Sequence, residues 1–295
     1  MSGLGRALDS PLNSGRQTTT FLRWVFDNAR RRIYPNRDIT LEFGNSLIDG
    51  PIDHPVMNLI FSVRGGYYDY DAMTALTILL RPGQGFIDIG ANIGSYSVLA
   101  AELIGAAGRV LAVEPLADQL VYLRRNLARI PTLSTVCTVP LADAQRPMSM
   151  VGDGATTRYL ADLSGGPIAS TLMTSTLDAE LAKIDWHSSG DFAKIDIEGW
   201  EPAAILGARE WLASGPDGLV LEANGLQKRC PVSWSAAVKL LHDHQMDFTW
   251  PAFATKTLHI FEDPASVSPF HDYLVLTAES RRRLEQGTDL IPQAA

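Results

Sequence analysis

The sequence predicts an α/β fold in which helices cover both faces of a doubly wound, mainly parallel sheet. Three observations support this fold class. Strand and helix patterns alternate from residue 85 onward, as they do in chains built from repeated strand-helix-strand units. Residues 86–97 combine a buried strand pattern, a turn with two glycines and the start of a helix. The length of 295 residues suits one large domain with an additional segment.

The composition disfavours several classes of function. The net charge of −8 argues against nucleic acid as a partner, because phosphate binding requires a basic face. Two cysteines, Cys137 and Cys230, provide neither a disulfide framework nor a metal-binding spacing. No uncharged apolar run approaches the ~18–20 residues of a membrane span, and no signal-peptide core follows the start. We therefore expect a soluble, cytoplasmic protein without a transmembrane segment. The sequence does not determine the oligomeric state, and a homo-oligomer is compatible with it.

The N-terminal residues divide into two segments. Residues 1–19 are expected to be disordered, because they offer few large apolar groups to offset their ordering entropy. From residue 20, apolar residues recur at helical spacing beside arginines, which predicts a helix. It is either a basic amphipathic helix that contacts a membrane surface or an anionic substrate, or, as we favour, a helix packed on the main domain with a solvated charged face. The residues concerned are Phe21, Leu22, Trp24, Val25, Phe26 and Ile33, with Arg23, Arg30, Arg31 and Arg32.

Residues 20–70 are predicted to form a helical and β cap ahead of a main domain at 71–280. Short strand-like pieces occur at 39–43, 47–49 and 59–63, separated by glycines and a proline. The aromatic and acidic cluster at 67–71 precedes a predicted helix. Its tyrosines either contribute to a pocket or pack half-buried with their hydroxyls in water, and the two interpretations have equal weight.

The turn at residues 90–94 is the most informative stretch. Gly90 and Gly94 provide backbone freedom or close approach to a ligand, and the helix that follows offers unpaired N–H groups. The spacing does not match the dinucleotide pattern G-x-G-x-x-G. Asp88, two residues before Gly90, would repel a pyrophosphate but suits a cationic ligand that carries an amino acid. The alternative is a turn without a ligand, in which Asp88 caps the helix.

The order Asp88-x-Gly90-x-x-x-Gly94 resembles the first motif of the class I S-adenosylmethionine-dependent methyltransferases, which have a Rossmann-like sheet. A second predicted strand, 109–113, ends at Glu114, whose carboxylate can accept hydrogen bonds from both ribose hydroxyls. A third strand, 135–141, leads to Asp143, which either accepts from the adenine amine or is a solvated turn residue. The predicted residues for binding S-adenosylmethionine are Asp88, Gly90, Asn92, Gly94, Glu114 and Asp143.

A second group of candidates lies around a predicted strand at 192–197. Lys194 and Asp196 interrupt its apolar pattern, and charges in an internal strand are costly to bury unless they are paired or functional. Asp196 and Glu198 would fall at the carboxyl end of the sheet, where parallel sheets bind ligands. The next strand, 218–222, ends at Glu222. Before this group, residues 152–175 are predicted to form short strands or a mobile lid.

These motifs narrow the resemblance to the FkbM family of methyltransferases. It is carried by Thr176-Leu-Asp178, residues 194–199, Leu206-Gly207-Ala208 and Glu222, and with the glycine turn it spans residues 67–225. The resemblance implies O-methylation, with S-adenosylmethionine, of a hydroxyl on a sugar, glycolipid or other secondary metabolite. It also implies seven strands, of which the last, at 271–277, is antiparallel. A strand at 246–250 and a connecting segment would precede that last strand, and a charged, frayed tail at 281–295 would follow. The bulky Trp200 departs from the expected small residue.

Two mechanisms can activate an aliphatic hydroxyl. A carboxylate can remove its proton, with Asp196 as the first choice and Glu198 as the second. Alternatively, Asp196, Glu222 and Asn224 can hold a divalent cation such as Mg²⁺, because hard oxygen ligands suit it. Lys194 is expected to pair with Glu198 or Glu222. The histidines form no metal-ligand pattern, and His187 and His271 are expected to be structural.

Other functions fit the sequence less well. An N-methyltransferase would usually carry an Asn/Asp-Pro-Pro-aromatic motif after the fourth strand, where this chain has residues 196–199. An NAD-dependent oxidoreductase would need a turn with three glycines. A methyltransferase-fold protein that binds S-adenosylmethionine without catalysis remains an alternative, because fold alone does not establish activity. The preferred acceptor is a neutral sugar hydroxyl, on a free small molecule, a glycolipid or a natural product.

Overall fold

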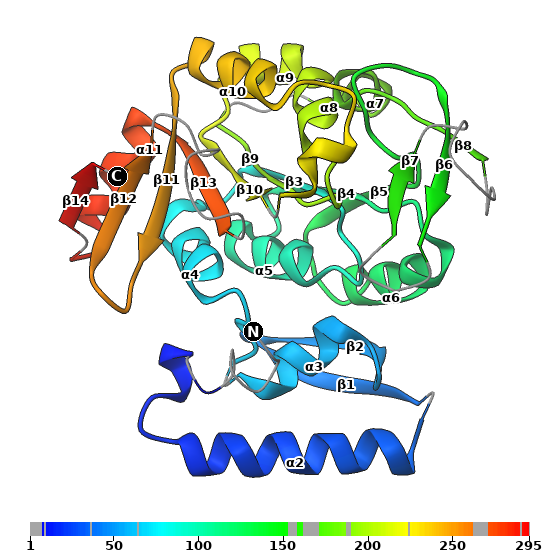
Figure 1. Ribbon diagram of the computed structural model, residues 1–295, viewed down its shortest axis with the longest axis vertical. Coiled ribbons are helices and arrows are strands. Elements are labelled where there is room, and N and C mark those ends of the chain that lie inside the picture. Colours follow the sequence, from blue (N-terminus) through cyan, green and yellow to red (C-terminus); the bar gives the residue numbers. More distant parts are fainter. Residues whose placement is uncertain are drawn as a thin grey trace.

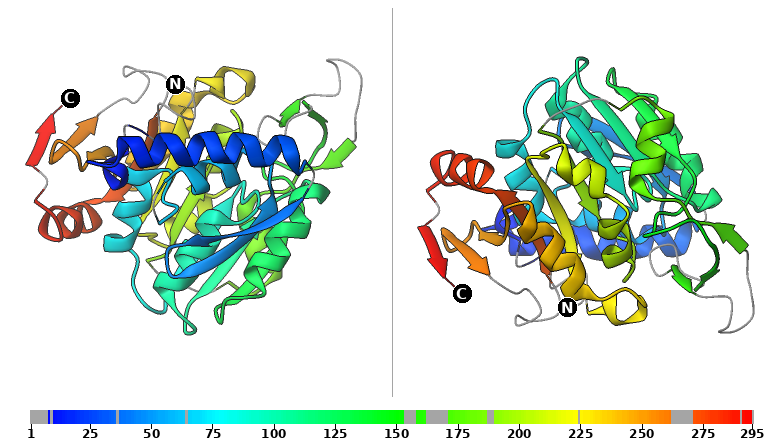
Figure 2. Two further views of the ribbon diagram at one scale, coloured as in Figure 1. Left: turned by 90° about the horizontal axis from the view of Figure 1, so that it is seen from below. Right: turned by 90° about the horizontal axis from the view of Figure 1, so that it is seen from above.

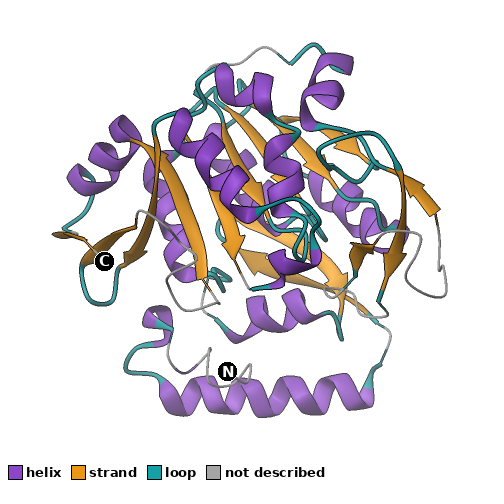
Figure 3. Cartoon of the chain, turned by 45° about the horizontal axis from the view of Figure 1, so that its top comes forward, coloured by secondary structure: helices purple, strands orange, loops and turns teal. Residues whose placement is uncertain are grey.

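The computed structural model describes residues 8, 10–35, 37–63, 65–152, 158–161, 171–186, 190–223, 225–261, 271–289 and 291–294. Its centre is a large sheet with helices on both faces (Figure 3). A small three-stranded sheet lies beyond one edge of the large sheet, and a unit formed by the N-terminal residues lies below it (Figure 1). The predicted α/β class is therefore confirmed.

In the described part of the chain, the large sheet has nine strands in the order β14-β12-β11-β13-β10-β9-β3-β4-β5. Strands β5, β4, β3, β9 and β10 are parallel to one another. Strand β13 lies between β10 and β11 and is antiparallel to both. Seven neighbouring strands, from β5 to β11 in this order, confirm the predicted mainly parallel sheet, and β13 is the predicted antiparallel strand. The nine strands are β3 (Gly85–Ile89), β4 (Arg109–Val113), β5 (Leu133–Cys137), β9 (Phe192–Ile195), β10 (Gly218–Ala223), β11 (Met246–Ala252), β12 (Thr257–Phe261), β13 (His271–Thr277) and β14 (Ile291–Ala294).

Strands β12 and β14 extend the sheet beyond the seven strands that the resemblance implied. Strand β12 occupies part of the predicted connecting segment. The frayed tail predicted at 281–295 was also wrong, because these residues contribute to helix α11 (Ala278–Gln286) and strand β14. The side chain of Thr277 caps α11 by accepting a hydrogen bond from the Ser280 N–H at 3.3 Å. Leu284 is fully buried, so one apolar side chain anchors an otherwise charged helix.

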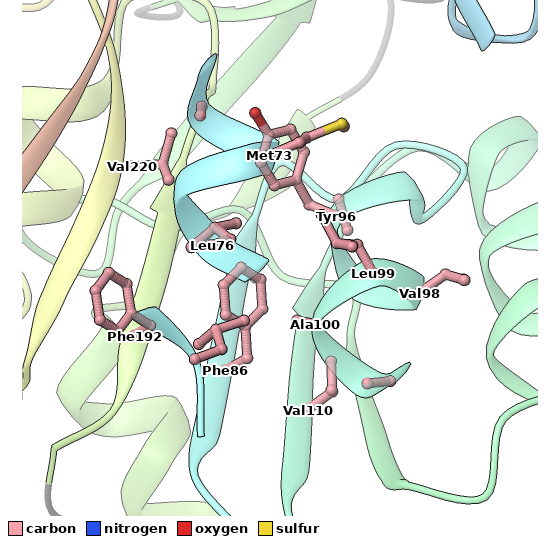
Figure 4. Close-up of a cluster of buried hydrophobic side chains, with 14 of the residues drawn as sticks. Met73, Leu76, Phe86, Tyr96, Val98, Leu99, Ala100, Val110, Phe192 and Val220 are labelled. Atoms are coloured by element: carbon pink, nitrogen blue, oxygen red, sulfur yellow. The ribbon is translucent and has the colours of Figure 1, made fainter. Parts of the chain in front are cut away.

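The strands alternate between two apolar cores, one on each face of the sheet. Phe86 and Phe192 point into one core, whereas their neighbours Ile87 and Ala193 point into the other, as the two-residue period of a strand requires. Figure 4 shows Phe86 and Phe192 below Leu76 in the first core. Helices α4 (Tyr70–Leu79), α5 (Ser95–Ile104), α6 (Ala117–Leu127) and α11 cover this face, and α7 (Leu177–Lys183), α8 (Glu201–Leu206), α9 (Arg209–Ala213) and α10 (Trp234–Asp243) cover the other.

The N-terminal unit is ordered from residue 10 onward within the described residues. It comprises the 3₁₀ helix η1 (Pro11–Asn13), helix α2 (Gln17–Ile33), the hairpin of β1 (Asp38–Phe43) and β2 (Ser46–Pro51), and helix α3 (Pro55–Ser62). The prediction of disorder over 1–19 was therefore wrong for η1 and the start of α2. Asn13 is buried, and its side-chain amide donates to the Ser62 carbonyl at 2.9 Å. This contact offsets the low apolar content of the segment.

Two further predictions for this unit were wrong. Residues 59–62 belong to helix α3 instead of a strand, because Pro55 starts the helix and the His54 ring accepts from the Val56 N–H at 3.2 Å. Helix α2 packs on α3 with its polar side, not with its apolar side, and Asp27 is buried in this contact. No helix within the described residues is long and apolar enough to cross a membrane.

Asn126 connects the N-terminal unit to the glycine turn. This fully buried residue of α6 accepts from the Asp49 N–H at 2.7 Å and donates to the Asp49 carbonyl at 3.0 Å. Its amide also donates to the Ile93 carbonyl at 2.7 Å. Strand β2 is thereby fixed against the turn that follows β3.

The small sheet accounts for Trp200. It consists of β7 (Tyr159–Ala161), β6 (Pro147–Val151) and β8 (Thr171–Met173). Strands β7 and β8 agree with the short strands predicted at 152–175, whereas β6 precedes that range. The remainder of the predicted lid, 153–157 and 162–170, lies outside the described residues. Trp200 is 1% exposed, and its indole N–H donates to the Leu160 carbonyl at 2.5 Å. A bulky residue occupies this position because it holds the small sheet to the main domain.

Candidate active site

A cavity lies at the carboxyl ends of β3, β4 and β9, which is where a parallel sheet places its ligands. The small sheet and the N-terminal unit close its sides, through Met150, Tyr159 and Leu160 on one side and Val56 on the other. The predicted site residues that line the cavity are Gly90, Asn92, Glu114, Asp196 and Glu198. The fold therefore brings together residues from the predicted cofactor-binding group and from the predicted catalytic group.

Close packing against β9 explains the glycine that opens the turn. Gly90 has a φ of +83°, and a Cβ atom there would lie 1.9 Å from the carbonyl oxygen of Asp196. Gly94 has a φ of +93°, and a Cβ atom there would lie 2.8 Å from Leu123 of α6. Asn92 also has a positive φ, +53°, and its side-chain oxygen accepts from the Ile93 N–H at 2.8 Å. The turn is shaped by close contacts within the protein, with the backbone at Asp196 and with the side chain of Leu123.

Glu114 joins the turns that follow β3 and β4. Its carboxylate is 5% exposed and accepts from the N–H of Asn92 at 2.9 Å and from the N–H of Leu116 at 2.8 Å. Burial raises the pKa of Glu114 to about 7, although these two hydrogen bonds oppose the rise. A carboxylate has about four acceptor positions, so Glu114 can still accept hydrogen bonds from a ligand in the cavity.

Asp88 lies behind the cavity instead of lining it. It is fully buried, and its Oδ2 accepts from the Ser97 hydroxyl of α5 at 2.6 Å. Its Oδ1 has no hydrogen-bond partner among the described residues. Burial raises the pKa of Asp88, against the effect of the nearby Lys194 cation. Through Ser97, Asp88 contacts the first turn of α5, and its role in binding S-adenosylmethionine stays a prediction.

Lys194 and Asp196 form an ion pair at the cavity wall, with side chains that are 9% and 35% exposed. The Lys194 ammonium is 3.4 Å from the Gly90 carbonyl, donates to Asp196 Oδ2 at 2.9 Å and lies over the ring of Tyr96. The predicted pairing of Lys194 with Glu198 or Glu222 was wrong, because residues two apart on a strand share one face and Asp196 is the nearer partner. Burial alone would lower the pKa of Lys194, but Asp196 and Asp88 together raise it, so the ammonium stays charged.

The three acids at this edge have different protonation states. Burial alone would raise the pKa of Asp196, but the Lys194 cation lowers it, so Asp196 is ionised. Burial and the Asp196 charge raise the pKa of Glu222, and their side chains are hydrogen-bonded, so Glu222 donates the proton. Glu198 has a φ of +56°, which is uncommon for a residue with a side chain. Burial and the Asp196 charge raise the pKa of Glu198 to about 7.

The predicted metal ligands are only partly described. Asp196 follows β9 and Glu222 is the last residue but one of the adjacent strand β10, whereas Asn224 lies outside the described residues, as does His187. In the described ranges, no three His, Cys, Asp or Glu side chains are grouped as a metal site would require. Asp143 does not line the cavity and forms an ion pair with Arg146 at 2.8 Å. The metal and the adenine contact both stay predictions.

Several cavity residues were not predicted individually. Tyr68 and Ser95 line the cavity and share a hydrogen bond of 2.7 Å between their hydroxyls. Tyr96 also lines it and donates to Asp69, which is hydrogen-bonded to Asp272. The aromatic and acidic cluster at 67–71 was the available signal. Tyr68 agrees with its interpretation as part of a pocket, whereas Tyr67 packs on Phe43 and Tyr70 packs on Phe253, as the packing interpretation expects. Asp272 lies on β13, and the sequence contained no signal that brings it here.

The chain is similar to several known proteins. The model for the Methyltransferase FkbM domain matches residues 88–245. The crystal structure of Methyltransferase FkbM from Methylobacillus flagellatus KT is 16% identical and has a TM-score of 0.43, and the alignment covers 75% of this chain and 52% of that one. Fibrillarin from Aeropyrum pernix, with natively bound S-adenosyl-L-methionine, is 10% identical with a TM-score of 0.38, over 70% of this chain and 73% of that one.

A shorter similarity involves the Ribosomal RNA large subunit methyltransferase E of Sorangium cellulosum (strain So ce56). It is 58% identical over 36 residues, which are 12% of this chain and 17% of that protein. The chain thus spans about half the length of the FkbM structure and less than a fifth of this curated relative. The domain match is broader: it covers more than half of the 295 residues and extends from Asp88 past Glu222. The chain therefore belongs to the FkbM methyltransferase family.

Proposed function

We propose that this protein is an S-adenosylmethionine-dependent O-methyltransferase that acts on a hydroxyl of a sugar, glycolipid or secondary metabolite. One observation carries the proposal. The turns that present Gly90, Asn92 and Glu114 face the same cavity as the acids Asp196 and Glu198. A nucleoside site and a set of proton acceptors therefore share one space, which is the arrangement that methyl transfer to a hydroxyl requires.

The cavity residues fit S-adenosylmethionine. Glu114 retains acceptor positions for a ribose diol. Val113, Pro140 and Leu141 provide an apolar wall that suits an adenine ring. The ionised Asp196 suits a ligand that carries positive charge. When bound, S-adenosylmethionine supplies an activated methyl group on a sulfonium with a built-in leaving group.

We propose Glu198 as the general base and Asp196 as a residue that holds the Lys194 ammonium at the cavity wall. This order reverses the expectation from the sequence. The Lys194 cation lowers the pKa of Asp196 and makes it a weak base, whereas the pKa of Glu198, about 7, matches the operating range of a base. Glu198 would take the proton from the acceptor hydroxyl. The buried Lys194 ammonium would orient the hydroxyl oxygen as a hydrogen-bond donor.

The first test measures cofactor binding and then transfer. Calorimetric titration should show that S-adenosylmethionine binds and NAD⁺ does not. Transfer of a labelled methyl group to panels of hydroxyl and amine acceptors, with and without Mg²⁺, then identifies the product atom. Binding without transfer to any acceptor would support a non-catalytic protein, and N-methylated products would overturn the assignment to oxygen.

Replacement of Glu198 by glutamine should lower turnover by about 100-fold or more, because the amide cannot accept the proton. The wild-type rate should rise with pH through about 7, as Glu198 ionises, and this rise should be absent in Glu198→Gln. Affinity for S-adenosylmethionine should change little. Glu210→Gln, on the exposed surface of α9, is the matched control. An unchanged rate and pH profile in Glu198→Gln would exclude Glu198 as the base.

Binding of S-adenosylmethionine should itself depend on pH through Glu114. Burial raises the pKa of Glu114 to about 7, and the ionised form is the better acceptor for two hydroxyls, so affinity should fall as the pH drops below about 7. Glu114→Gln should weaken binding by about tenfold at pH 8, where the charged acceptor is lost, and should remove most of the pH dependence. Titrations of both proteins at pH 6 and pH 8 measure this, and equal affinities at both pH values in the wild type would contradict it.

A further inference from the structure

Helix α2 presents a row of large apolar side chains to solvent. It is the outermost element of the N-terminal unit in Figure 1 and lies in front in the view from below in Figure 2. Four of these side chains recur at spacings of three or four residues, and the fifth follows seven residues later, which is two helical turns, so the row lies along one side of the helix. Its members are Phe21, Leu22, Val25, Phe26 and Ile33, which are 46%, 60%, 42%, 62% and 65% exposed. We call these five residues the α2 apolar face.

The polar side of α2 is fixed against the protein, so the helix cannot turn its apolar face inward. Asp27 is 2% exposed and pairs with Arg30 at 2.9 Å and with Arg31 at 3.1 Å. The guanidinium groups of Arg23 and Arg30 lie 5.4 and 4.7 Å from the ring centre of Phe61 in α3. Both ion pairs lie within α2 and would survive a rotation of the helix, so the contacts that fix its orientation are those of Arg23 and Arg30 with the Phe61 ring.

The stretch of sequence that contains α2 is strongly basic, although the whole chain has a net charge of −8. Arg32 lies among the exposed residues of the helix, and it forms no ion pair with the described residues. Asp27 is the one acid in the sequence from 16 to 37, and its charge is already shared by two arginines. The arginines of this stretch are Arg16, Arg23, Arg30, Arg31, Arg32 and Arg37.

We propose that α2 is an interfacial helix that seats this protein on an anionic lipid bilayer. A fixed helix with exposed Phe, Leu, Val and Ile side chains and flanking arginines has the two features that surface binding requires, an apolar face to insert and cations to contact lipid headgroups. Pairing of α2 with a second copy is disfavoured, because it would bring two arginine-rich stretches together. This inference goes beyond the proposed function and does not rest on it.

Vesicle sedimentation tests the proposal with the full chain. The protein should sediment with vesicles of equal parts phosphatidylcholine and phosphatidylglycerol and should stay in the supernatant with phosphatidylcholine alone. High salt should weaken the binding. The double variant Leu22→Gln with Phe26→Gln should reduce binding by about tenfold or more, because two apolar side chains no longer insert. Arg32→Glu should reduce it by about tenfold, because it replaces a cation by an anion at the lipid surface.

An exposed apolar side chain outside α2 provides the control. Leu133→Gln removes an apolar side chain that is 68% exposed on β5, far along the sequence from α2, and should leave vesicle binding unchanged. All variants should keep the wild-type melting temperature and affinity for S-adenosylmethionine. Binding that is absent from both vesicle types, or insensitive to the α2 variants, would overturn the proposal. A dimer that the double variant converts to a monomer, without vesicle binding, would assign the face to a second copy instead.

Discussion

Gly90→Ala is expected to abolish detectable binding of S-adenosylmethionine and to lower the free energy of unfolding by at least about 3 kcal/mol. The new Cβ atom would lie 1.9 Å from the carbonyl oxygen of Asp196, and φ at this position is +83°. The clash cannot be relieved by a side-chain rotation, because its partner is backbone at the end of a strand paired with β3. Relief must separate the ends of β3 and β9, and that movement displaces both halves of the cavity.

Gly83→Ala is the matched control for this prediction. Gly83 has nearly the same φ, +86°, but no atom lies within 4 Å of a Cβ atom built there. The control therefore carries the conformational cost of a left-handed residue, about 1 kcal/mol, without the clash. Urea unfolding and calorimetric titration of both variants measure the difference. If Gly90→Ala bound the cofactor as tightly as Gly83→Ala does, the close approach of β9 would have no role in shaping the site.

Lys194→Met should lower the free energy of unfolding by about 1–3 kcal/mol at pH 8, less than for a fully buried pair because the Asp196 side chain is 35% exposed, and should reduce turnover severely. The ammonium is the cation beside two buried or half-buried carboxylates, Asp88 and Asp196, and removing one partner of a buried ion pair leaves the other charge uncompensated. Methionine has a similar length, so the packing against Tyr96 is largely retained. The effect therefore reports on charge.

The pH dependence of this variant has a definite sign. In the wild type, Lys194 lowers the pKa of Asp196 below its ordinary value, so the stabilisation is present above that value and is lost in acid. Without Lys194, burial raises the pKa values of Asp88 and Asp196, and the folded state then gains protons as the pH falls. The difference in stability between wild type and variant should be larger at pH 8 than at pH 5. Urea unfolding at the two pH values measures it.

Lys239→Met provides the comparison for an exposed pair. Lys239 and Asp243 form an ion pair on α10 with side chains that are 73% and 55% exposed. Such pairs contribute little, so the free energy of unfolding should be nearly unchanged at both pH values. An equally small effect of Lys194→Met would mean that the buried carboxylates are protonated in the wild type, and the charge assignment of the site would be wrong.

Local patterns were sufficient to predict the centre of the fold. Strand β3, its turn and helix α5 are contiguous in sequence, so their periodicity and glycines predict both the elements and their order. The carboxyl ends of parallel strands lie on one edge, which places Glu114 and Asp196 in one cavity before any distance is known. Both residues line that cavity in the structure.

The partners of individual side chains could not be predicted in the same way. Asp69 and Asp272 are hydrogen-bonded although about 200 residues separate them, and no periodicity reports such a contact. The direction in which α2 faces depends on the packing of Arg23 and Arg30 against Phe61 of α3, which the helical pattern alone does not determine. Which of the acids is ionised, and therefore which can act as the base, depends on which of them lies nearest to Lys194. These features follow from tertiary packing.

The position of β13 delays the completion of the sheet during folding. Strand β13 comes after β10 and β11 in the sequence, yet it lies between them and pairs with both. Until residues 271–277 emerge during synthesis, β10 and β11 each have an unpaired edge, and open edges of apolar strands promote association with other chains. Completion of the sheet must therefore wait for the last part of the chain. A chain truncated before residue 271 would form an incomplete sheet, and the open edges of β10 and β11 would promote aggregation.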